Sequence, residues 1–258
     1  MSGLFRKIGN FLFHTRNVLF PITIVVLLFL WPPVAIGHTG SDLLLFSGLL
    51  FILIGQAIRV LTISLEYIKR GGKNRQIFAE KLVTGGIFSH CRNPMYVGNT
   101  LLGIGVLSVA GNVTGLVVGS ILILATYQLI VHSEECFLRE KFAEIYDAYC
   151  ASVPRWLPNI RSLKETIHDY EYKFDWSRVA IKEHTTLFMY LMLPLVLIAW
   201  KLHLANLLED YQFVFLSLAV LFISAFSGVR FLKKSGRLIA MRKKARNKNT
   251  TQQKDKTA

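Results

Sequence analysis

Long apolar stretches, interrupted by short polar ones, dominate the pattern along this chain. A helix needs about 20 mostly apolar residues to cross a bilayer. Stretches of this kind occur at Val18–Ile36, Leu43–Ile63, Tyr96–Ala110, Val113–Val131, Thr185–Lys201 and Phe213–Phe231. Turn-forming residues lie between members of each pair, at 37–40, 111–112 and 206–210. The pattern predicts an all-α polytopic transmembrane bundle of about six spans, whose third span is short.

A polar segment after the fourth apolar stretch has a different periodicity. Helical spacing of its apolar residues predicts a cytoplasmic interfacial helix over 134–150, which the prolines of 153–158 bring to an end. We therefore divide the chain into an N-terminal cytoplasmic amphipathic segment (1–17), a central membrane domain (18–158), a cytoplasmic linker (159–184), a C-terminal transmembrane hairpin (185–232) and a basic tail (233–258) that we expect to be disordered.

Charge adds an orientation to this picture. Hydrophobic residues make up 52% of the chain and charged residues 18%, and the formal net charge is +14. The basic residues gather at the N-terminus, after the second and fourth spans and in the tail, so six spans with both termini cytoplasmic satisfy the positive-inside rule. This distribution favours attraction to anionic lipid headgroups. No base-reading motif accompanies it, so we do not expect nucleic acid as a partner.

Two polar clusters, at residues 85–96 and 132–135, flank the third and fourth spans. A hairpin returns the chain to the side that it left, so both clusters should lie at the same membrane depth. We expect Arg92 and Tyr96 to face Glu134 and Glu135 across adjacent helices. Two adjacent carboxylates near a membrane are costly unless cations or hydrogen-bond donors satisfy them.

The start of the third span resembles an anion-binding helix end. Asn93 suits the N-cap and Pro94 the first helical position. Such a helix start leaves backbone donors that can bind a carboxylate, and Arg92 adds a positive fork beside them. Neither the three cysteines nor His90 and His132 have partner spacing that would complete a metal site, so no metal is predicted.

The ordered combination of these residues carries a family resemblance. Its parts are Leu82-Val83-Thr84-Gly85-Gly86-Ile87-Phe88, Arg92-Asn93-Pro94-Met95-Tyr96-Val97-Gly98, and Glu134-Glu135 followed by Phe142, Tyr146 and Tyr149. Over roughly 54–158 the chain resembles the membrane-embedded isoprenylcysteine carboxyl methyltransferase and phospholipid methyltransferase superfamily.

The resemblance implies S-adenosyl-L-methionine bound at the cytoplasmic face, in a site spanning 82–150. The implied cofactor-binding residues are His90, Arg92, Pro94, Tyr96, Gly105, Glu134 and Glu135. Gly103-Ile104-Gly105 is similar to a Gly-x-Gly that borders the cofactor in the phospholipid branch, although close helix packing is the favoured interpretation of these glycines. Asn93 departs from the commonest family form, which has histidine there.

The implied reaction is methyl transfer to a lipophilic acceptor. Arg92, Glu135 and His132 are the candidate catalytic residues. A carboxylate or thiolate acceptor needs no general base, whereas an amine or alcohol would need one, for which Glu135 and His132 are the candidates. Prenylcysteine, a phospholipid amine, a small thiol and a lipid alcohol all stay open as acceptors.

Two other functions also stay open. Membrane sterol reductases share a similar Arg-x-Pro-x-Tyr hairpin and use NADPH, and a non-catalytic membrane protein could retain the hairpin. Arg59 lies inside the second span, where it either snorkels to the cytoplasmic side or points into the bundle. The expected location is the plasma (inner) membrane of a bacterium or the endoplasmic reticulum of a eukaryote. The sequence indicates no oligomeric state.

Overall fold

The computed structural model of the chain describes residues 2–65, 77, 79–159 and 174–238, and within them it is all-helical. The helices are α1 (Ser2–Leu30), α2 (Thr39–Leu65), α3 (Pro94–Ala110), α4 (Val113–Ser152), α6 (Trp176–Leu204) and α7 (Leu208–Lys234), with a short 3-10 helix η2 (Gly86–Ser89). Five of these helices are long and apolar enough to cross a membrane, and α3 is shorter. The polytopic all-α prediction is confirmed.

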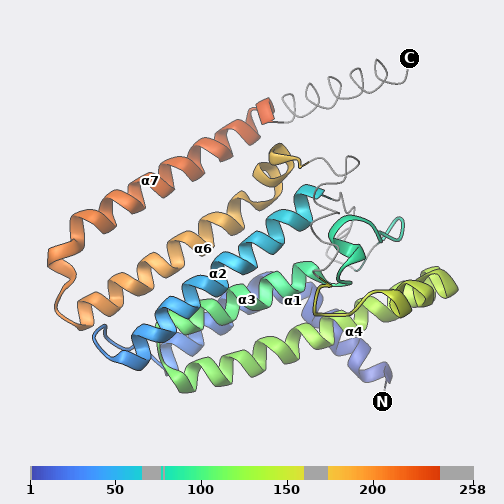
Figure 1. Ribbon diagram of the computed structural model, residues 1–258, viewed down its shortest axis with the longest axis horizontal. Coiled ribbons are helices and arrows are strands. Elements are labelled where there is room, and N and C mark those ends of the chain that lie inside the picture. The colour runs from blue at the N-terminus through green and yellow to red at the C-terminus, as the bar shows by residue number, and fades with distance from the viewer. Residues whose placement is uncertain (1, 66–76, 78, 160–173, 239–258) are drawn as a thin grey trace.

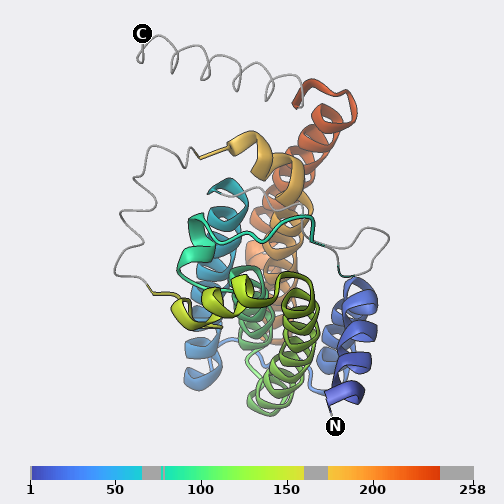
Figure 2. The ribbon, with the colours of Figure 1, turned by 90° about the vertical axis from the view of Figure 1, so that its right-hand side faces the viewer.

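The helices run side by side in one bundle (Figures 1 and 2). Helix α3 packs against α2, α4 and α6, whereas α7 packs on α6 and has no buried residue. The N-terminal end of α1 and the C-terminal end of α7 lie toward the same end of the bundle (Figure 1). The C-terminal end of α2 and the N-terminal ends of α3 and α6 lie there too, and we call it the site end. That the site end faces the cytoplasm stays a prediction.

Glycines allow α2 and α3 to approach closely. A Cβ atom on Gly105 would lie 2.8 Å from the carbonyl oxygen of Gly48, and one on Gly55 would lie 2.8 Å from the carbonyl oxygen of Gly98. Small residues at such positions permit backbone-to-backbone packing in membranes. The close contact continues to the site end, where it brings Arg59 of α2 against α3.

The turn between α3 and α4 forms as predicted. Gly111 ends α3 in the left-handed region with φ 78°, which glycine adopts without strain. The Asn112 side chain then accepts a hydrogen bond from the Gly115 backbone at 3.1 Å and caps α4. Nearby, Lys201 of α6 is fully buried and donates to the Ser41 hydroxyl of α2 at 2.6 Å, which ties these two helices together at this far end.

The bounds of several helices differ from those of the predicted segments, because polar residues also occur within the long helices. Helix α1 begins at Ser2, so the predicted amphipathic segment 1–17 is continuous with the first span, which ends at Leu30 before two prolines. Helix α4 runs through the predicted interfacial helix to Ser152, with one non-helical residue, Ala143 (φ 43°).

Helix α6 also extends beyond the predicted fifth span on its N-terminal side. Helix α6 begins at Trp176 and not at Thr185, so residues 176–184 of the predicted linker are helical. Asp175 caps this start by accepting a hydrogen bond from the Arg178 backbone at 2.9 Å. The rest of the linker (160–173), the basic loop at 66–76 and the tail from 239 lie outside the described residues.

Candidate active site

A cavity of about 370 Å³ opens at the site end. Five helices and the segment before α3 contribute to its walls. The lining residues are Arg16 and Asn17 of α1; Arg59, Thr62 and Ile63 of α2; Phe88, Arg92 and Asn93 before α3; Pro94, Met95, Tyr96 and Asn99 of α3; Glu134 of α4; and Arg178, Lys182 and Glu183 of α6.

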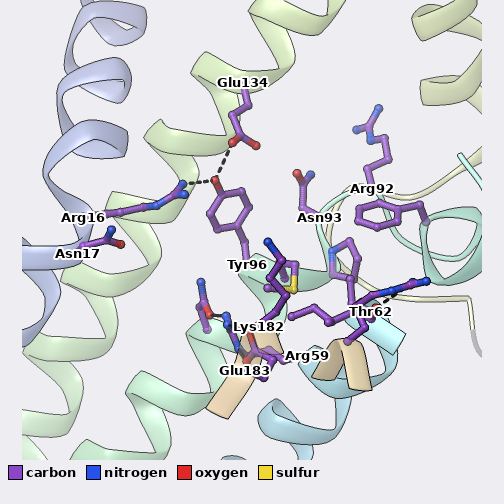
Figure 3. A pocket seen from close by; sticks show the side chains of 16 residues that line it. Arg16, Asn17, Arg59, Thr62, Arg92, Asn93, Tyr96, Glu134, Lys182 and Glu183 are labelled. Atoms are coloured by element: carbon purple, nitrogen blue, oxygen red, sulfur yellow. Dashed lines mark hydrogen bonds and ion pairs between the residues drawn. The ribbon is translucent and has the colours of Figure 1, made fainter. Parts of the chain in front are cut away.

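A hydrogen-bonded chain crosses one side of this cavity (Figure 3). The Tyr96 hydroxyl donates to Glu134 Oε1 at 2.8 Å and accepts from Arg16 Nη1 at 2.9 Å. The predicted approach of Tyr96 to Glu134 is therefore confirmed. The sequence did not indicate a role for Arg16, because a basic residue before a span looks like an ordinary interface anchor. The Arg16 guanidinium also lies 3.9 Å from the ring centre of Phe13.

A second cluster surrounds Glu135 just behind the cavity wall. Arg92 Nε lies 3.6 Å and Arg155 Nη2 lies 3.0 Å from its carboxylate oxygens, and the Asn93 amide donates to it at 3.4 Å. The predicted approach of Arg92 to Glu135 is confirmed. Glu135 is 8% exposed and does not line the cavity. It therefore braces the wall residues Arg92 and Asn93 from behind.

Asn93 occupies the predicted N-cap position of α3 without making the expected cap. Its side chain makes no capping hydrogen bond and points instead to Glu135 and to the carbonyl oxygen of Arg155, at 3.2 Å. The first turn of α3 is thus left without a side-chain acceptor beside the cavity. That is the arrangement in which a helix start can bind an external anion.

Arg59 points into the bundle, which resolves the two alternatives for this residue. Its guanidinium makes a two-pronged ion pair with Glu183 of α6, with N···O distances of 2.9 and 2.7 Å, and also donates to Asn99 of α3. Both charges are buried, so the pairing offsets a desolvation cost that either would carry alone. The pair fastens α6 to α2 and α3 at the cavity.

The first turns of α6 supply two further cations. Arg178 Nη1 donates to the carbonyl oxygens of Ile63 and Ser64, each at 3.3 Å, and so covers the end of α2. Lys182 is exposed, and in Figure 3 its ammonium end points toward the side of the cavity where Tyr96 and Asn93 lie. Sequence reasoning missed both residues because it placed them in the linker.

Besides Glu135, three predicted residues do not line the cavity. His90 is buried, with Nδ1 2.8 Å from the carbonyl oxygen of Asn159. His132 lies on α4 with Nε2 3.7 Å from the sulfur of Cys136. Gly105 faces Gly48 and Ile52 of α2, a contact that favours helix packing over ligand binding as the role of this glycine. Among the described ranges, no three His, Cys, Asp or Glu side chains are placed to hold a metal ion.

The arrangement defines a class of protein: a membrane-spanning helix bundle with a charged cavity at the end of its spans. The family model for phospholipid methyltransferase matches residues 43–145, which include most of α2, all of α3 and most of α4. The chain belongs to the isoprenylcysteine and phospholipid methyltransferase superfamily and is a membrane methyltransferase of lipophilic acceptors.

Two curated relatives support this membership. The chain is 31% identical over 170 residues to the cobalt-zinc-cadmium resistance protein CzcN of Cupriavidus metallidurans, a match that covers 62% of this chain and 71% of that protein. It is 29% identical over 120 residues to the protein-S-isoprenylcysteine O-methyltransferase of Schizosaccharomyces pombe, which covers 44% of this chain and 49% of that enzyme. No solved structure gives a significant match.

Proposed function

We propose that the cavity at the site end binds S-adenosyl-L-methionine from the cytoplasm and that its methyl group passes there to an acceptor held in the bilayer. One observation carries the proposal: the Tyr96–Glu134 pair and Arg92 meet around one cavity in a chain of this superfamily. The interface is where a water-soluble donor and a lipophilic acceptor can meet.

The residues present fit this cofactor. The volume of about 370 Å³ is within the range of small-molecule sites, and the lining offers groups of both charges. The carboxylate of Glu134 suits a cationic or hydroxyl-bearing part of the ligand. Arg92 and the uncapped start of α3 suit a carboxylate. Phe88 and Met95 add apolar surface.

The protein's main task would be to align donor and acceptor and to exclude water. When bound, S-adenosyl-L-methionine supplies an activated methyl group on a sulfonium, whose leaving group is a neutral thioether. Tyr96 fixes the carboxylate of Glu134 through a hydrogen bond, and Arg16 fixes Tyr96 in turn. Such preorganised positioning accounts for much of the catalysis in reactions with good leaving groups.

Glu134 is also the carboxylate best placed to take a proton. An amine or alcohol acceptor would have to lose one, whereas a carboxylate or thiolate would not. Glu135 is engaged by two arginines behind the wall, and His132 lies outside the lining. We therefore assign the role of base, if the acceptor needs one, to Glu134 in place of Glu135 and His132.

Binding of labelled S-adenosyl-L-methionine to the purified full chain tests the proposal. We expect Glu134→Gln and Arg92→Ala to weaken binding about tenfold, the effect of losing one charge-assisted hydrogen bond. Glu144→Gln, an exposed position on the same helix, is the matched control and should bind as the wild type does. Equal binding by all variants would refute the site. Thermal stabilisation by NADPH but not by S-adenosyl-L-methionine would favour a reductase.

A second experiment tests the reaction. Membranes containing the wild type or Glu134→Gln would receive methyl-labelled cofactor, and lipids and thiols would be separated and counted. Label in a lipophilic product with the wild type alone is expected. Label that remains entirely in the cofactor would contradict methyl transfer under these conditions, and failure to bind either nucleotide would favour a non-catalytic protein.

A further inference from the structure

Arg92 lines the cavity, yet its bonds to the rest of the protein are long. Its Nε lies 3.6 Å from Glu135 Oε1 without making a hydrogen bond, and its Nη1 donates to the carbonyl oxygen of Cys150 at 3.5 Å. Within the described residues its Nη2 has no partner. Charge-assisted bonds of arginine are usually about 2.7–2.9 Å long. Most of the hydrogen-bonding capacity of Arg92 is therefore not used by the protein.

A second arginine, Arg155, competes with Arg92 for the same carboxylate. Arg155 Nη2 lies 3.0 Å from Glu135 Oε2, whereas Arg92 approaches the other oxygen at the longer distance. Glu135 is 8% exposed, and a carboxylate so deeply buried needs a cationic partner. Arg155 supplies that partner, so Arg92 does not have to neutralise Glu135 alone.

Backbone hydrogen bonds hold Arg155 beside the cavity wall. The segment 153–159, which follows α4, runs along the loop before α3. The Arg92 backbone amide donates to the carbonyl oxygen of Pro154 at 2.9 Å, and the Asn93 side chain donates to that of Arg155 at 3.2 Å. These bonds use backbone acceptors of the segment, so they would survive replacement of the Arg155 side chain. The effect of its guanidinium can therefore be tested alone.

The Arg155 guanidinium acts at a distance from the cavity. Arg155 is not among the lining residues, and its Nε makes no hydrogen bond. In the part of the chain that the structure describes, the guanidinium contacts one charged group, Glu135. Arg155 also lies beyond the segment that matches the family model, which ends at residue 145. Any influence of this side chain on the cavity therefore has to pass through Glu135.

We infer that Arg155 is a positioning residue: by neutralising Glu135, it keeps the Arg92 guanidinium available to the carboxylate of the cofactor. This inference rests on the proposed function, in which Arg92 meets that carboxylate. Without the Arg155 side chain, Arg92 would be the cation left beside Glu135, and the buried carboxylate would draw it into a direct pair. The ligand would then lose Arg92 although Arg92 itself is unchanged.

Two ligands separate this role from a general effect on the fold. S-adenosyl-L-methionine has the carboxylate, whereas its decarboxylated analogue has the same sulfonium, ammonium and nucleoside without it. Both dissociation constants are measured on one preparation of the full chain in a neutral maltoside detergent, and their ratio is compared between variants. Because both ligands need the folded site, this ratio does not depend on the fraction of the protein that is folded.

Arg155→Met should weaken binding of S-adenosyl-L-methionine about five- to tenfold and change binding of the analogue by less than about twofold. Arg155→Lys keeps a cation beside Glu135 and should retain most of the affinity. Combining Arg155→Met with Glu135→Gln should restore binding, because no carboxylate then competes for Arg92. In an Arg92→Ala background, Arg155→Met should have no further effect. Simple damage to the fold would give neither the rescue nor this dependence on Arg92.

Arg139→Met is the matched control, because it removes an arginine of α4 that pairs with Asp147 at 2.7 Å on the exposed surface. It should bind both ligands as the wild type does. Undiminished binding of S-adenosyl-L-methionine to Arg155→Met would overturn the inference alone, as would an equal loss for both ligands or a double variant that stays weak. A wild type that binds neither ligand would refute the proposed function, and the inference with it.

Discussion

At the scale of single residues, the Tyr96 hydroxyl holds the site together because it links two helices to α3. It accepts from Arg16 of α1 and donates to Glu134 of α4. Its ring packs against Tyr127, with ring centres 5.4 Å apart, so the aromatic contact does not depend on the hydroxyl. The two roles of the side chain can therefore be separated by removing one atom.

Tyr96→Phe should lower the efficiency of methyl transfer about tenfold or more while leaving the fold intact. Hydrogen bonds to charged groups contribute roughly 1.5–3 kcal/mol each, and the variant loses two of them. The measurement is kcat/KM for label transfer, together with the melting temperature. Tyr211→Phe, at an exposed position on α7, is the control. Full activity in Tyr96→Phe would mean that Glu134 needs no such support.

Cys91 shows how burial changes reactivity beside the site. It is 1% exposed, and burial raises the pKa of its thiol above the usual range, against smaller lowering effects of the Asn93 backbone and Arg92. Because the thiolate is the reactive form, a raised pKa leaves less of it at any given pH. The Cys91 thiol also lies 3.3 Å from the carbonyl oxygen of Trp156, to which it donates.

We expect iodoacetamide at pH 8 to modify Cys136 and Cys150 before Cys91, since both are only partly buried. Peptide mass spectrometry at several times would give the three rates. In denaturing detergent the three rates should converge, which is the control. Modification of Cys91 as fast as Cys150 in the native protein would show that the loop before α3 opens readily.

At the scale of helices, the contact between α2 and α3 depends on glycines that have no room for a side chain. A Cβ atom on Gly105 would meet backbone atoms of α2, at 2.8 Å from Gly48 O and 3.0 Å from Ile52 N. Backbone cannot move aside as a flexible side chain can, so the helices would have to separate.

Gly105→Ala should therefore destabilise the protein by about 1–3 kcal/mol, the usual cost of overpacking. Gly228→Ala on α7 adds the same atom where nothing lies within 4 Å, and it should be neutral or slightly stabilising. Melting temperatures in detergent would compare them. Affinity for the cofactor, measured below the melting point, should stay within about twofold for Gly105→Ala if the glycine serves packing. A large loss of affinity in a stable variant would instead support ligand contact.

The ion pair between Arg59 and Glu183 should behave as a buried pair does. Removing one partner leaves a buried, uncompensated charge, so Glu183→Gln should cost about 3–5 kcal/mol. The double variant Arg59→Met with Glu183→Leu should recover much of that stability, because no charge is left unpaired. Glu209→Gln, exposed at the start of α7, is the control. Equal stability of the wild type and Glu183→Gln would show that α6 is fastened by other contacts.

The sequence predicted these helices well where hydrophobicity alone determines their bounds. It predicted them less well where polar residues within a helix are paired with residues far away in the chain. The turn at Gly111 and Asn112 was predictable because both residues have strong local preferences. The start of α6 was not, because Arg178, Lys182 and Glu183 look like residues of a polar linker. Their charges are accommodated by contacts with α2 or by the cavity, and such contacts between distant segments leave no local signal.

The same reasoning explains which parts of the site were predictable. Tyr96 and Glu134 could be brought together because a hairpin of known length sets their depth. Arg16 and Arg155 could not, since the positions of α1 and of the segment after α4 follow from packing and not from a turn. The side-chain direction of Asn93 was also missed, because the N-cap preference competes there with the acceptors Glu135 and Arg155.

At the scale of the whole molecule, the bundle has two different ends. The N-terminal end of α1 and the C-terminal end of α7 lie toward the site end. The turns at 31–38, 111–112 and 205–207 lie at the other end (Figure 1). The basic residues around the cavity and the positive-inside rule together predict that the site end faces the cytoplasm.

Cysteine labelling of sealed inside-out and right-side-out vesicles tests this orientation, with a cysteine-free background carrying either Asn206→Cys or Lys234→Cys. A membrane-impermeant maleimide should label the Lys234→Cys protein only in inside-out vesicles and the Asn206→Cys protein only in right-side-out ones. Permeabilised vesicles, in which both are labelled, are the control. The reverse pattern would invert the orientation, and labelling of both from one side would contradict the topology.

The segment that matches the family model is smaller than the part of the chain that forms the cavity. Helix α1 and the start of α6 lie on either side of the matched segment in sequence, and both close the cavity in space. A protein fragment cut at the limits of the matched segment would carry only part of the chamber. Conversely, exchanging α6 between relatives offers a way to change which molecule is methylated while leaving the rest of the cavity wall untouched.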